Sequence, residues 1–340
     1  MSPDRGRARE HLVEERYERF AGYRTRVLRV AGNGPPLLLL HGFSDSADAW
    51  RPVLRVLAGR ARAAVAVDLP SHGRADALDD SRPMLPQLTA FTEAAAVWCG
   101  PGTVLAGNSL GGLLGLLLAE RSEALGGVVG VCPAGLGYSR LMLAGAAQLR
   151  TPARRRAVAM LLGVPPVWLT ARAARASIGR AFGERAGVDP RYALDYAGNI
   201  APRLARRRLL ALLYGLHQEA LVSPLRPERV RCPVMLVWGE RDPLTPPAAA
   251  RVLTDALPGV RTEILARVGH MPQVETPARL VELLLRFAPA RGSGTGLDRQ
   301  RDAGQVPDLV VGRDQSGGAA EGLPGTGVAG EPRERAAGDL

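Results

Sequence analysis

Apolar runs and amphipathic stretches alternate along the first part of the chain. Polar and apolar positions alternate in Tyr23–Val30, which is typical of an antiparallel strand. Residues 36–40 and 63–67 are continuous apolar runs, as in strands that are buried on both faces. Residues 47–57 and 85–99 have the pattern of helices. This order predicts parallel strands connected by crossover helices.

The alternation stops after a predicted strand at 125–131 and returns near residue 231. The intervening residues, 133–230, are mostly helix formers, with alanine and arginine dominant and no run that resembles a strand. Further strands are predicted at 234–238 and 261–265, and a helical stretch follows each of them. The pattern therefore indicates a helical insertion between two strands of an α/β core.

The predicted fold is an α/β fold with a mostly parallel open sheet, flanked by helices and carrying an inserted helical cap. Its core comprises residues 21–132 and 231–288, and the cap comprises residues 133–230. Residues 1–20 are charged and are expected to form a lead-in with one helical turn or two. Residues 289–340 contain 12 glycines and no aromatic residue. We expect them to form a disordered tail, because they cannot bury enough apolar surface to offset their ordering entropy.

Composition and charge alter this picture little. The chain has 340 residues, of which 46% are hydrophobic, so it can bury a sizeable core. Its formal net charge is +11, and all 44 basic residues are arginine. Arginine clusters at 154–156 and 206–208 lie in helical stretches without interleaved aromatic residues. We interpret them as solvated helix faces rather than as sites for nucleic acid or anionic lipid.

The cysteines and the apolar runs bear on compartment. Cys99, Cys132 and Cys232 are odd in number and lack the spacing of a metal site, which favours buried thiols in a reducing compartment. The charged N-terminus lacks the apolar core of a signal peptide. The most apolar run, 104–119, is interrupted and falls short of the roughly 20 residues that span a bilayer. We expect a cytoplasmic protein with no stable membrane insertion, no metal and no cofactor; its oligomeric state is not predicted.

Ser109 stands at the apex of a predicted strand–turn–helix, between apolar runs at 103–105 and 113–119. The residues from Gly107 to Gly111 have the pattern Gly-x-Ser-x-Gly of a nucleophile elbow. Strand and helix pass so closely in such a turn that side chains two positions either side of the serine would collide, and glycine removes them. The pattern predicts a nucleophilic serine, although a glycine-rich chain also produces it by chance.

A nucleophilic serine needs a base, and the base needs an acid that orients it. In the elbow arrangement the order along the chain is serine, acid, histidine, and each partner follows a strand. Among five histidines, only His270 follows a late strand, so it is the predicted base. Asp242 follows the 234–238 strand and is the predicted acid. Glu240 is the weaker candidate, because it is closer to the end of the strand.

The same reaction needs hydrogen-bond donors for the oxyanion that develops on the substrate. The backbone N–H of Leu110, at the start of the helix after the serine, is one predicted donor. The backbone N–H of Phe43, after the 36–40 strand, is the other, and Gly42 lets the backbone approach the substrate there. His41 is expected to hydrogen-bond neighbouring loops rather than to act as the base.

Five segments of the chain occur in an order that is shared with a known superfamily. They are residues 41–43, 68–73, 107–112, 238–242 and 269–275. Together they resemble the serine-nucleophile branch of the α/β-hydrolase superfamily, over about residues 20–289. The resemblance implies a serine hydrolase with the cap over its site. Serine rather than aspartate as the nucleophile argues against the haloalkane dehalogenase and epoxide hydrolase branches.

The predicted function is hydrolysis of a carboxylic ester, or a related acyl bond, of a small molecule through an acyl-enzyme. Asn108 also resembles the carbon–carbon bond hydrolases that cleave ring-fission products, and an arginine-rich cap could hold a substrate carboxylate. A third alternative is a non-catalytic small-molecule receptor on the same fold. It is disfavoured because such proteins commonly lose a member of the triad, whereas this chain keeps all three predicted members. The identity of the substrate and the bond that is cleaved stay open.

Overall fold

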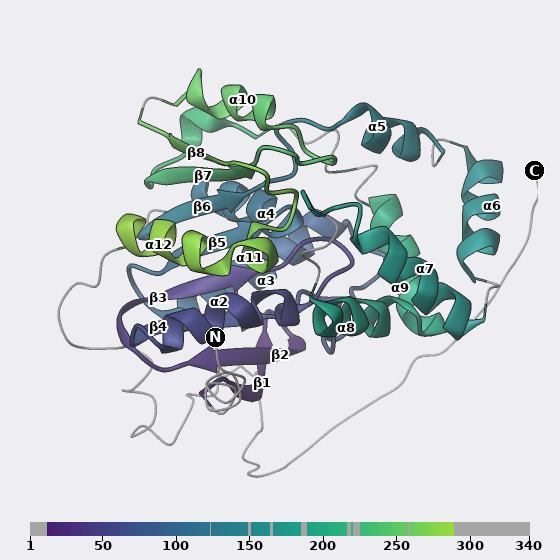
Figure 1. Cartoon of the computed structure of the whole chain (residues 1–340), viewed down its shortest axis with the longest axis horizontal. Coiled ribbons are helices and arrows are strands. Elements are labelled where there is room, and N and C mark those ends of the chain that lie inside the picture. Colours follow the sequence, from purple (N-terminus) through teal and green to yellow (C-terminus); the bar gives the residue numbers. More distant parts are fainter. Residues whose placement is uncertain are drawn as a thin grey trace, which may run out of the picture. The chain divides into compact units, whose positions relative to one another are not determined.

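The computed structural model describes residues 12–122, 124–148, 151–163, 166–184, 189–215, 219, 225–257 and 259–288. One sheet of eight strands lies at the centre of this part of the chain (Figure 1). In chain order the strands are β1 (Glu14–Phe20), β2 (Tyr23–Val30), β3 (Asn33–Leu40), β4 (Arg62–Val67), β5 (Val104–Asn108), β6 (Gly127–Val131), β7 (Val234–Gly239) and β8 (Arg261–Leu265).

The spatial order of the strands is β1-β2-β4-β3-β5-β6-β7-β8. β1 pairs antiparallel with β2, and β2 pairs antiparallel with β4. Every later pairing, from β4–β3 to β7–β8, is parallel. The predicted α/β fold with a mostly parallel open sheet is therefore confirmed.

β1 corrects one sequence expectation. The lead-in was expected to carry a helical turn, but Glu14–Phe20 is a strand that pairs with β2 along its whole length. Five of its seven residues are charged and most are exposed, because the strand lies at the edge of the sheet. Charged edge strands are common, since they discourage pairing with other chains, and they lack the apolar alternation that reveals a strand in a sequence.

Helices cover both faces of the sheet, with α2 and α12 in front and α3 and α4 behind in Figure 1. Alternate residues of β3 point to opposite faces: Leu38 and Leu40 pack with α3 and α4, whereas Leu37 and Leu39 pack with α2 and α12. A strand buried on both faces must be apolar throughout, which explains the continuous runs in the sequence. The helices of the core are η1 (Ala47–Trp50), α2 (Arg51–Ala58), α3 (Met84–Cys99), α4 (Leu110–Ala119), η5 (Pro247–Ala250), α10 (Arg251–Thr254), α11 (Pro272–Glu275) and α12 (Pro277–Phe287).

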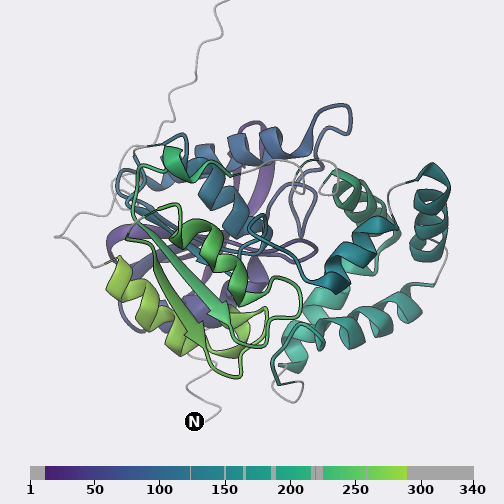
Figure 2. The same ribbon diagram turned by 90° about the horizontal axis from the view of Figure 1, so that it is seen from above.

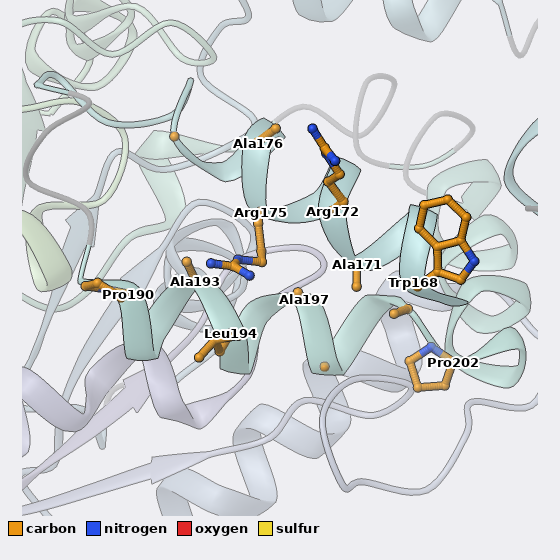
Figure 3. Close-up of a pocket in the computed structure, with 13 residues that line it drawn as sticks. Trp168, Ala171, Arg172, Arg175, Ala176, Pro190, Ala193, Leu194, Ala197 and Pro202 are labelled. Atoms are coloured by element: carbon orange, nitrogen blue, oxygen red, sulfur yellow. The ribbon is translucent and has the colours of Figure 1, made fainter. Parts of the chain in front are cut away.

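The described part of the insertion between β6 and β7 is helical. It contains α5 (Arg140–Ala147), α6 (Pro152–Gly163), α7 (Val167–Ile178), α8 (Pro190–Ile200) and α9 (Arg203–Gly215), with the short η4 (Pro227–Arg229) before β7. Figure 2 shows α5 to α9 grouped to one side of the sheet. α8 contacts η1, and α9 contacts α3. A trough lined by residues of 168–179 and 190–202 runs between α7 and α8 (Figure 3).

Other expectations concern termini, thiols and membrane segments. Residues 1–11 and the expected tail, 289–340, lie outside the described residues. Cys99, Cys132 and Cys232 are buried free thiols. Among the helices that the structure describes, none combines the length and the apolar character needed to cross a membrane.

Candidate active site

Ser109 lies in the turn between β5 and α4, and its backbone is strained. Its φ is 51°, in a region that costs residues other than glycine about 1–3 kcal/mol. The N–H of Ser109 donates to the carbonyl of Val131 at 3.0 Å, and its carbonyl accepts from the N–H groups of Leu113 and Ala134, each at 3.0 Å. These hydrogen bonds hold the turn in place and leave the serine partly exposed at the carboxyl end of β5.

Gly107 and Gly111 stand where strand and helix approach most closely. A Cβ at position 107 would lie 2.2 Å from the carbonyl of Gly111, and a Cβ at position 111 would lie 2.4 Å from the carbonyl oxygen of Leu40. Both clashes involve backbone atoms, so no side-chain rotation can relieve them. The turn that presents Ser109 therefore requires glycine at both positions.

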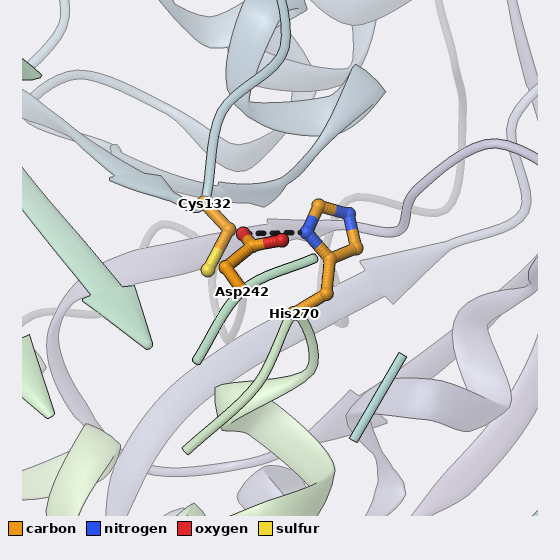
Figure 4. Close-up of side chains that lie close together, drawn as sticks. All are labelled: Cys132, Asp242 and His270. Carbon is orange, nitrogen blue, oxygen red and sulfur yellow. Dashed lines mark hydrogen bonds and ion pairs between the residues drawn. The ribbon is translucent and has the colours of Figure 1, made fainter. Parts of the chain in front are cut away.

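Asp242 and His270 are hydrogen-bonded to each other (Figure 4). Oδ2 of Asp242 accepts from Nδ1 of His270 at 2.8 Å, and both side chains are buried. Asp242 follows β7 and His270 follows β8, so two adjacent parallel strands deliver them to the same edge of the sheet. Because Nδ1 donates, Nε2 is left as the nitrogen that can accept a proton.

Four hydrogen bonds converge on the Asp242 carboxylate. Oδ1 accepts from the N–H groups of Leu244 and Thr245, and Oδ2 accepts from the Thr245 hydroxyl as well as from His270. Burial alone would raise the pKa of Asp242, but the bonds from His270, Leu244 and Thr245 bring it below its usual value. Thr245 is not among the predicted site residues; its only sequence signal is its place three residues after an aspartate that follows a strand.

Asn108 joins the serine turn to the histidine loop. Its buried side-chain amide donates to the carbonyl oxygen of His270 at 3.0 Å and to that of Val131 at 3.2 Å. The residue before Ser109 therefore positions the backbone of His270. Asn108, which in the sequence suggests a substrate class, has a positioning role in these contacts.

Gly42 and Phe43 follow β3 and lie beside the serine. A Cβ at Gly42 would lie 3.2 Å from the Cβ of Ser109, so only a glycine backbone fits comfortably there. Leu110 is the first residue of α4, and the first N–H groups of a helix have no acceptor within it. The structure thus brings the segments of both predicted oxyanion donors, Phe43 and Leu110, next to Ser109.

His41 hydrogen-bonds the loop that contains Gly42 and Phe43. Its Nε2 accepts from the N–H of Leu69 at 2.9 Å, so Nδ1 carries the proton and donates to the carbonyl of Gly42 at 2.8 Å. Burial lowers the pKa of His41 to about 4, which keeps the ring neutral. Both ring nitrogens of His41 form hydrogen bonds, so His41 connects neighbouring loops, as the sequence predicts.

Three side chains on one face of α8 hold the 41–46 loop from the other side. They are four and three residues apart, which places them on one helix face. The pairs are Tyr192 hydroxyl to Asp45 Oδ2 at 2.7 Å, Tyr196 hydroxyl with Ser44 hydroxyl at 3.1 Å, and Asn199 Nδ2 to Ser46 Oγ at 2.8 Å. These residues are not among the predicted site residues, and their helical spacing is the one signal that could have revealed them.

Cys132 is a third buried group beside the acid and base. Its Sγ and one ligand atom each of Asp242 and His270 lie within 4.8 Å of one another (Figure 4). Burial and the nearby Asp242 charge raise the pKa of the Cys132 thiol well above its usual value. The thiol stays protonated and faces the carbonyl oxygen of Gly269 at 3.8 Å. Since Asp242 is already saturated with donors, the cluster has the chemistry of a packed hydrogen-bonded pair rather than of a metal centre.

A cavity of about 350 Å³ lies between the core loops and the insertion. Asp45 and His72 line it from the core, and Asn199 and Arg208 line it from the insertion. The His72 ring packs edge-on against Phe43, with ring centroids 6.0 Å apart. His72 therefore contacts both the cavity and Phe43, whose backbone N–H is a predicted oxyanion donor.

Comparisons with known proteins identify the family of the chain. Residues 37–283 match the model of the alpha/beta hydrolase family. A protein of uncharacterised function from Mycobacterium bovis is 28% identical over 278 residues, which cover 78% of each chain. The pimeloyl-[acyl-carrier protein] methyl ester esterase of Aeromonas hydrophila is 27% identical over 268 residues, covering 75% of this chain and 96% of that protein.

The fold is also shared with solved structures. The enol-lactonase from Burkholderia xenovorans superposes with a TM-score of 0.62 at 19% identity, covering 80% of this chain and 99% of that one. The family match spans most of the chain and includes Ser109, Asp242 and His270. The chain therefore belongs to the alpha/beta hydrolase family.

Proposed function

We propose that this chain is a serine hydrolase that cleaves a carboxylic ester, or a related acyl bond, of a small molecule. The observation that carries the proposal is the buried hydrogen bond between Asp242 and His270, in a loop that Asn108 ties to the turn of Ser109. The Aeromonas esterase, with which the chain aligns over most of its length, supports ester cleavage.

In the proposed mechanism, Ser109 Oγ attacks the substrate carbonyl carbon while His270 Nε2 takes the hydroxyl proton. The ionised Asp242 stabilises the imidazolium that forms. The N–H groups of Phe43 and Leu110 donate to the tetrahedral oxyanion. His270 then protonates the leaving alcohol, and a water molecule activated by the same nitrogen hydrolyses the acyl-enzyme.

The insertion, residues 133–230, acts in this proposal as a cap that shapes the substrate pocket and excludes water. The cavity of about 350 Å³ beside the 41–46 loop has the size for a small substrate. Its lining residues do not include Ser109 or His270, so in this proposal it receives the part of the substrate that lies away from the reacting bond. Buried thiols support a cytoplasmic location for the reaction. In this proposal the substrate is a small acyl compound.

A fluorophosphonate probe tests the nucleophile directly. We expect the probe to label Ser109, as mapped by mass spectrometry of the adduct, and the Ser109→Ala variant to lose both labelling and turnover of p-nitrophenyl esters. A panel of esters of graded acyl length then ranks the substrates. Equal labelling of the parent chain and the Ser109→Ala variant would overturn the proposal.

Hydrolysis of a carbon–carbon bond on the same residues is the second candidate. Arg74 and Arg208 line the cavity beside the 41–46 loop, where they could hold a substrate carboxylate. Turnover of a ring-fission diketone at a higher kcat/KM than any p-nitrophenyl ester would favour this second reaction. Turnover of the esters alone would exclude it.

A further inference from the structure

The trough between α7 and α8 is a second hollow that the proposed reaction does not use (Figure 3). Its volume is about 950 Å³, within the range of roughly 300–1,000 Å³ that is usual for small-molecule sites. All of its lining residues belong to α7, α8 and the turns next to them. It shares only Gly198 and Pro202 with the cavity beside the 41–46 loop, so α8 separates the two.

Small side chains keep the trough open. The lining positions recur every three or four residues on both helices, so each helix presents one face to it. Alanine and glycine dominate these faces, with Ala171 and Gly179 on the α7 side and Ala193 and Ala197 on the α8 side. Leucine at such positions would close the space between two packed helices, so this sequence leaves a hollow there.

The charged side chains that line the trough in the described residues are all positive. Among the residues that the structure describes, Arg172 and Arg175 are the only charged ones that line it, and both are exposed. Neither guanidinium hydrogen-bonds or pairs with another residue in the part of the chain that the structure describes. In Figure 3 the Arg175 side chain extends from α7 towards α8, whereas the Arg172 side chain points away from α8; Trp168 and Pro202 both lie near one end. The trough therefore combines apolar walls with one guanidinium group, that of Arg175, that extends across it, and a second, that of Arg172, that lies at its rim.

The surrounding insertion reinforces this charge. Residues 133–230 contain 16 arginines and five acidic residues. Their excess of 11 positive charges equals the net charge of the whole chain, +11, so the remaining residues are neutral in sum. The excess positive charge of the chain therefore lies in the insertion, which favours the binding of anions there.

We propose that this trough binds one molecule of a long-chain carboxylate. Its alkyl chain lies between α7 and α8, and its carboxylate is held by Arg175, since guanidinium groups bind carboxylates through strong, directed hydrogen bonds. The exposed Arg172, one turn away on α7, adds positive charge at the rim of the trough. Trp168 and Arg175 are separated by about 10 Å along the helix, at a rise of roughly 1.5 Å per residue. An extended alkyl chain that starts at Arg175 reaches Trp168. The site is independent of Ser109.

Trp168 provides the readout. Trp50 and Trp238 are fully buried, and Trp98 packs against the core, whereas the Trp168 side chain is 68% exposed. The experiment uses the full-length chain with Ser109→Ala, so that binding is separated from catalysis. The probe is 9,10-dibromostearate below its micellar concentration, because bromine quenches tryptophan fluorescence on contact. We expect saturable quenching that Trp168→Phe removes.

Paired variants test the chemistry. Arg172→Gln combined with Arg175→Gln should raise the half-saturating concentration at least tenfold, and so should replacing the probe by its uncharged methyl ester. Arg154→Gln combined with Arg156→Gln is the matched control, because these exposed arginines lie on α6 outside the trough, and it should have no effect. Ala176→Phe, at an exposed lining position, should block binding by filling the trough.

Three results would overturn the proposal. The first is equal weakening by the two arginine pairs, which would mean a diffuse charge effect. The second is quenching that persists in Trp168→Phe. The third is quenching only by vesicles of brominated phosphatidylglycerol and not by monomeric dibromostearate, which would assign the face to a membrane surface. None of these results depends on whether Ser109 is the nucleophile.

Discussion

The hydrogen bond between Asp242 and His270 matters through the tautomer that it selects. With Nδ1 donating to the carboxylate, Nε2 is free to take a proton. The hydroxyl and two N–H groups that also reach Asp242 hold its pKa low. In the proposed mechanism Asp242 therefore stays ionised throughout the reaction.

Replacing Asp242 should cause a large loss of activity that is specific to this position. Asp242→Asn can donate to Nδ1 and favour the wrong tautomer, so we expect kcat on a p-nitrophenyl ester to fall about 10³–10⁴-fold. The matched control is Glu240→Gln, which keeps the acceptor for the N–H of Arg267 and should retain full activity. Comparable losses in both variants would show that the acid has been misassigned.

The glycines of the Ser109 turn make a second prediction at the scale of single residues. Gly111→Ala places a Cβ 2.4 Å from the Leu40 carbonyl oxygen and should lower the free energy of unfolding by about 3 kcal/mol or more. Gly145→Ala, on the exposed helix α5, meets no atom within 4 Å and should raise it by about 0.5–1 kcal/mol. Urea titrations of both variants measure the difference. Similar midpoints would contradict the close approach.

At the scale of elements, α8 links the insertion to the loop that carries a proposed oxyanion donor. Tyr192, Tyr196 and Asn199 engage three consecutive loop residues. The helix is therefore part of what sets the position of the Phe43 N–H. In this proposal the cap contributes to the chemistry as well as to substrate choice.

Tyr192→Phe tests that link. It keeps the ring but removes the hydroxyl that donates to Asp45, so the loop loses one of its three ties to α8. We expect kcat to fall about tenfold with KM little changed, because small displacements of transition-state donors are costly. Tyr17→Phe, on the edge strand β1, is the matched control. A change in KM alone would indicate a substrate contact instead.

Elements differ in how far their sequence predicts them. The buried strands β3 to β7 are predicted because burial on both faces demands unbroken apolar runs. β1 is not, because an edge strand needs no apolar face. The order of Ser109, Asp242 and His270 follows from strand ends, whereas Thr245 and the α8 contacts depend on distances between segments that no local pattern encodes. The trough depends on which faces of α7 and α8 meet, and an alanine- and arginine-rich stretch does not specify that.

At the scale of the whole molecule, buried ionisable groups set the pH range of stability. Burial lowers the pKa of His41 to about 4 and that of His72 to about 3, below the value of about 6.5 in an unfolded chain. Between these values the unfolded state binds more protons than the native state, so stability falls as the pH falls. The two histidines together outweigh the single opposing effect of Asp45, so thermal unfolding should show Tm decreasing from pH 6.5 towards pH 4. A flat profile would contradict it.

The titration of Asp45 changes the stability of the fold in the opposite direction. Burial raises its pKa to about 7, despite hydrogen bonds from Tyr192 and Ser46 that lower it and with Asp48 and Asp68 adding to the rise. Its stabilising effect is complete below the unfolded value of about 3.9 and is lost as the pH rises towards 7. Asp45→Asn should therefore gain Tm relative to the parent chain between pH 4 and pH 8. A constant difference across this range would show that Asp45 titrates normally.

The insertion leaves the sheet after β6 and returns to it at β7, and these two strands pair directly with each other. Its length can therefore change without altering any strand pairing, provided that the segment around Ala181, whose carbonyl accepts from the N–H of His270 at 2.7 Å, is kept. Mutations in such an insertion are constrained mainly by the ligand that the protein must bind, whereas mutations in the sheet are constrained by the need to fold. Descendants of one ancestral gene can thus diversify in ligand choice while inheriting the same sheet.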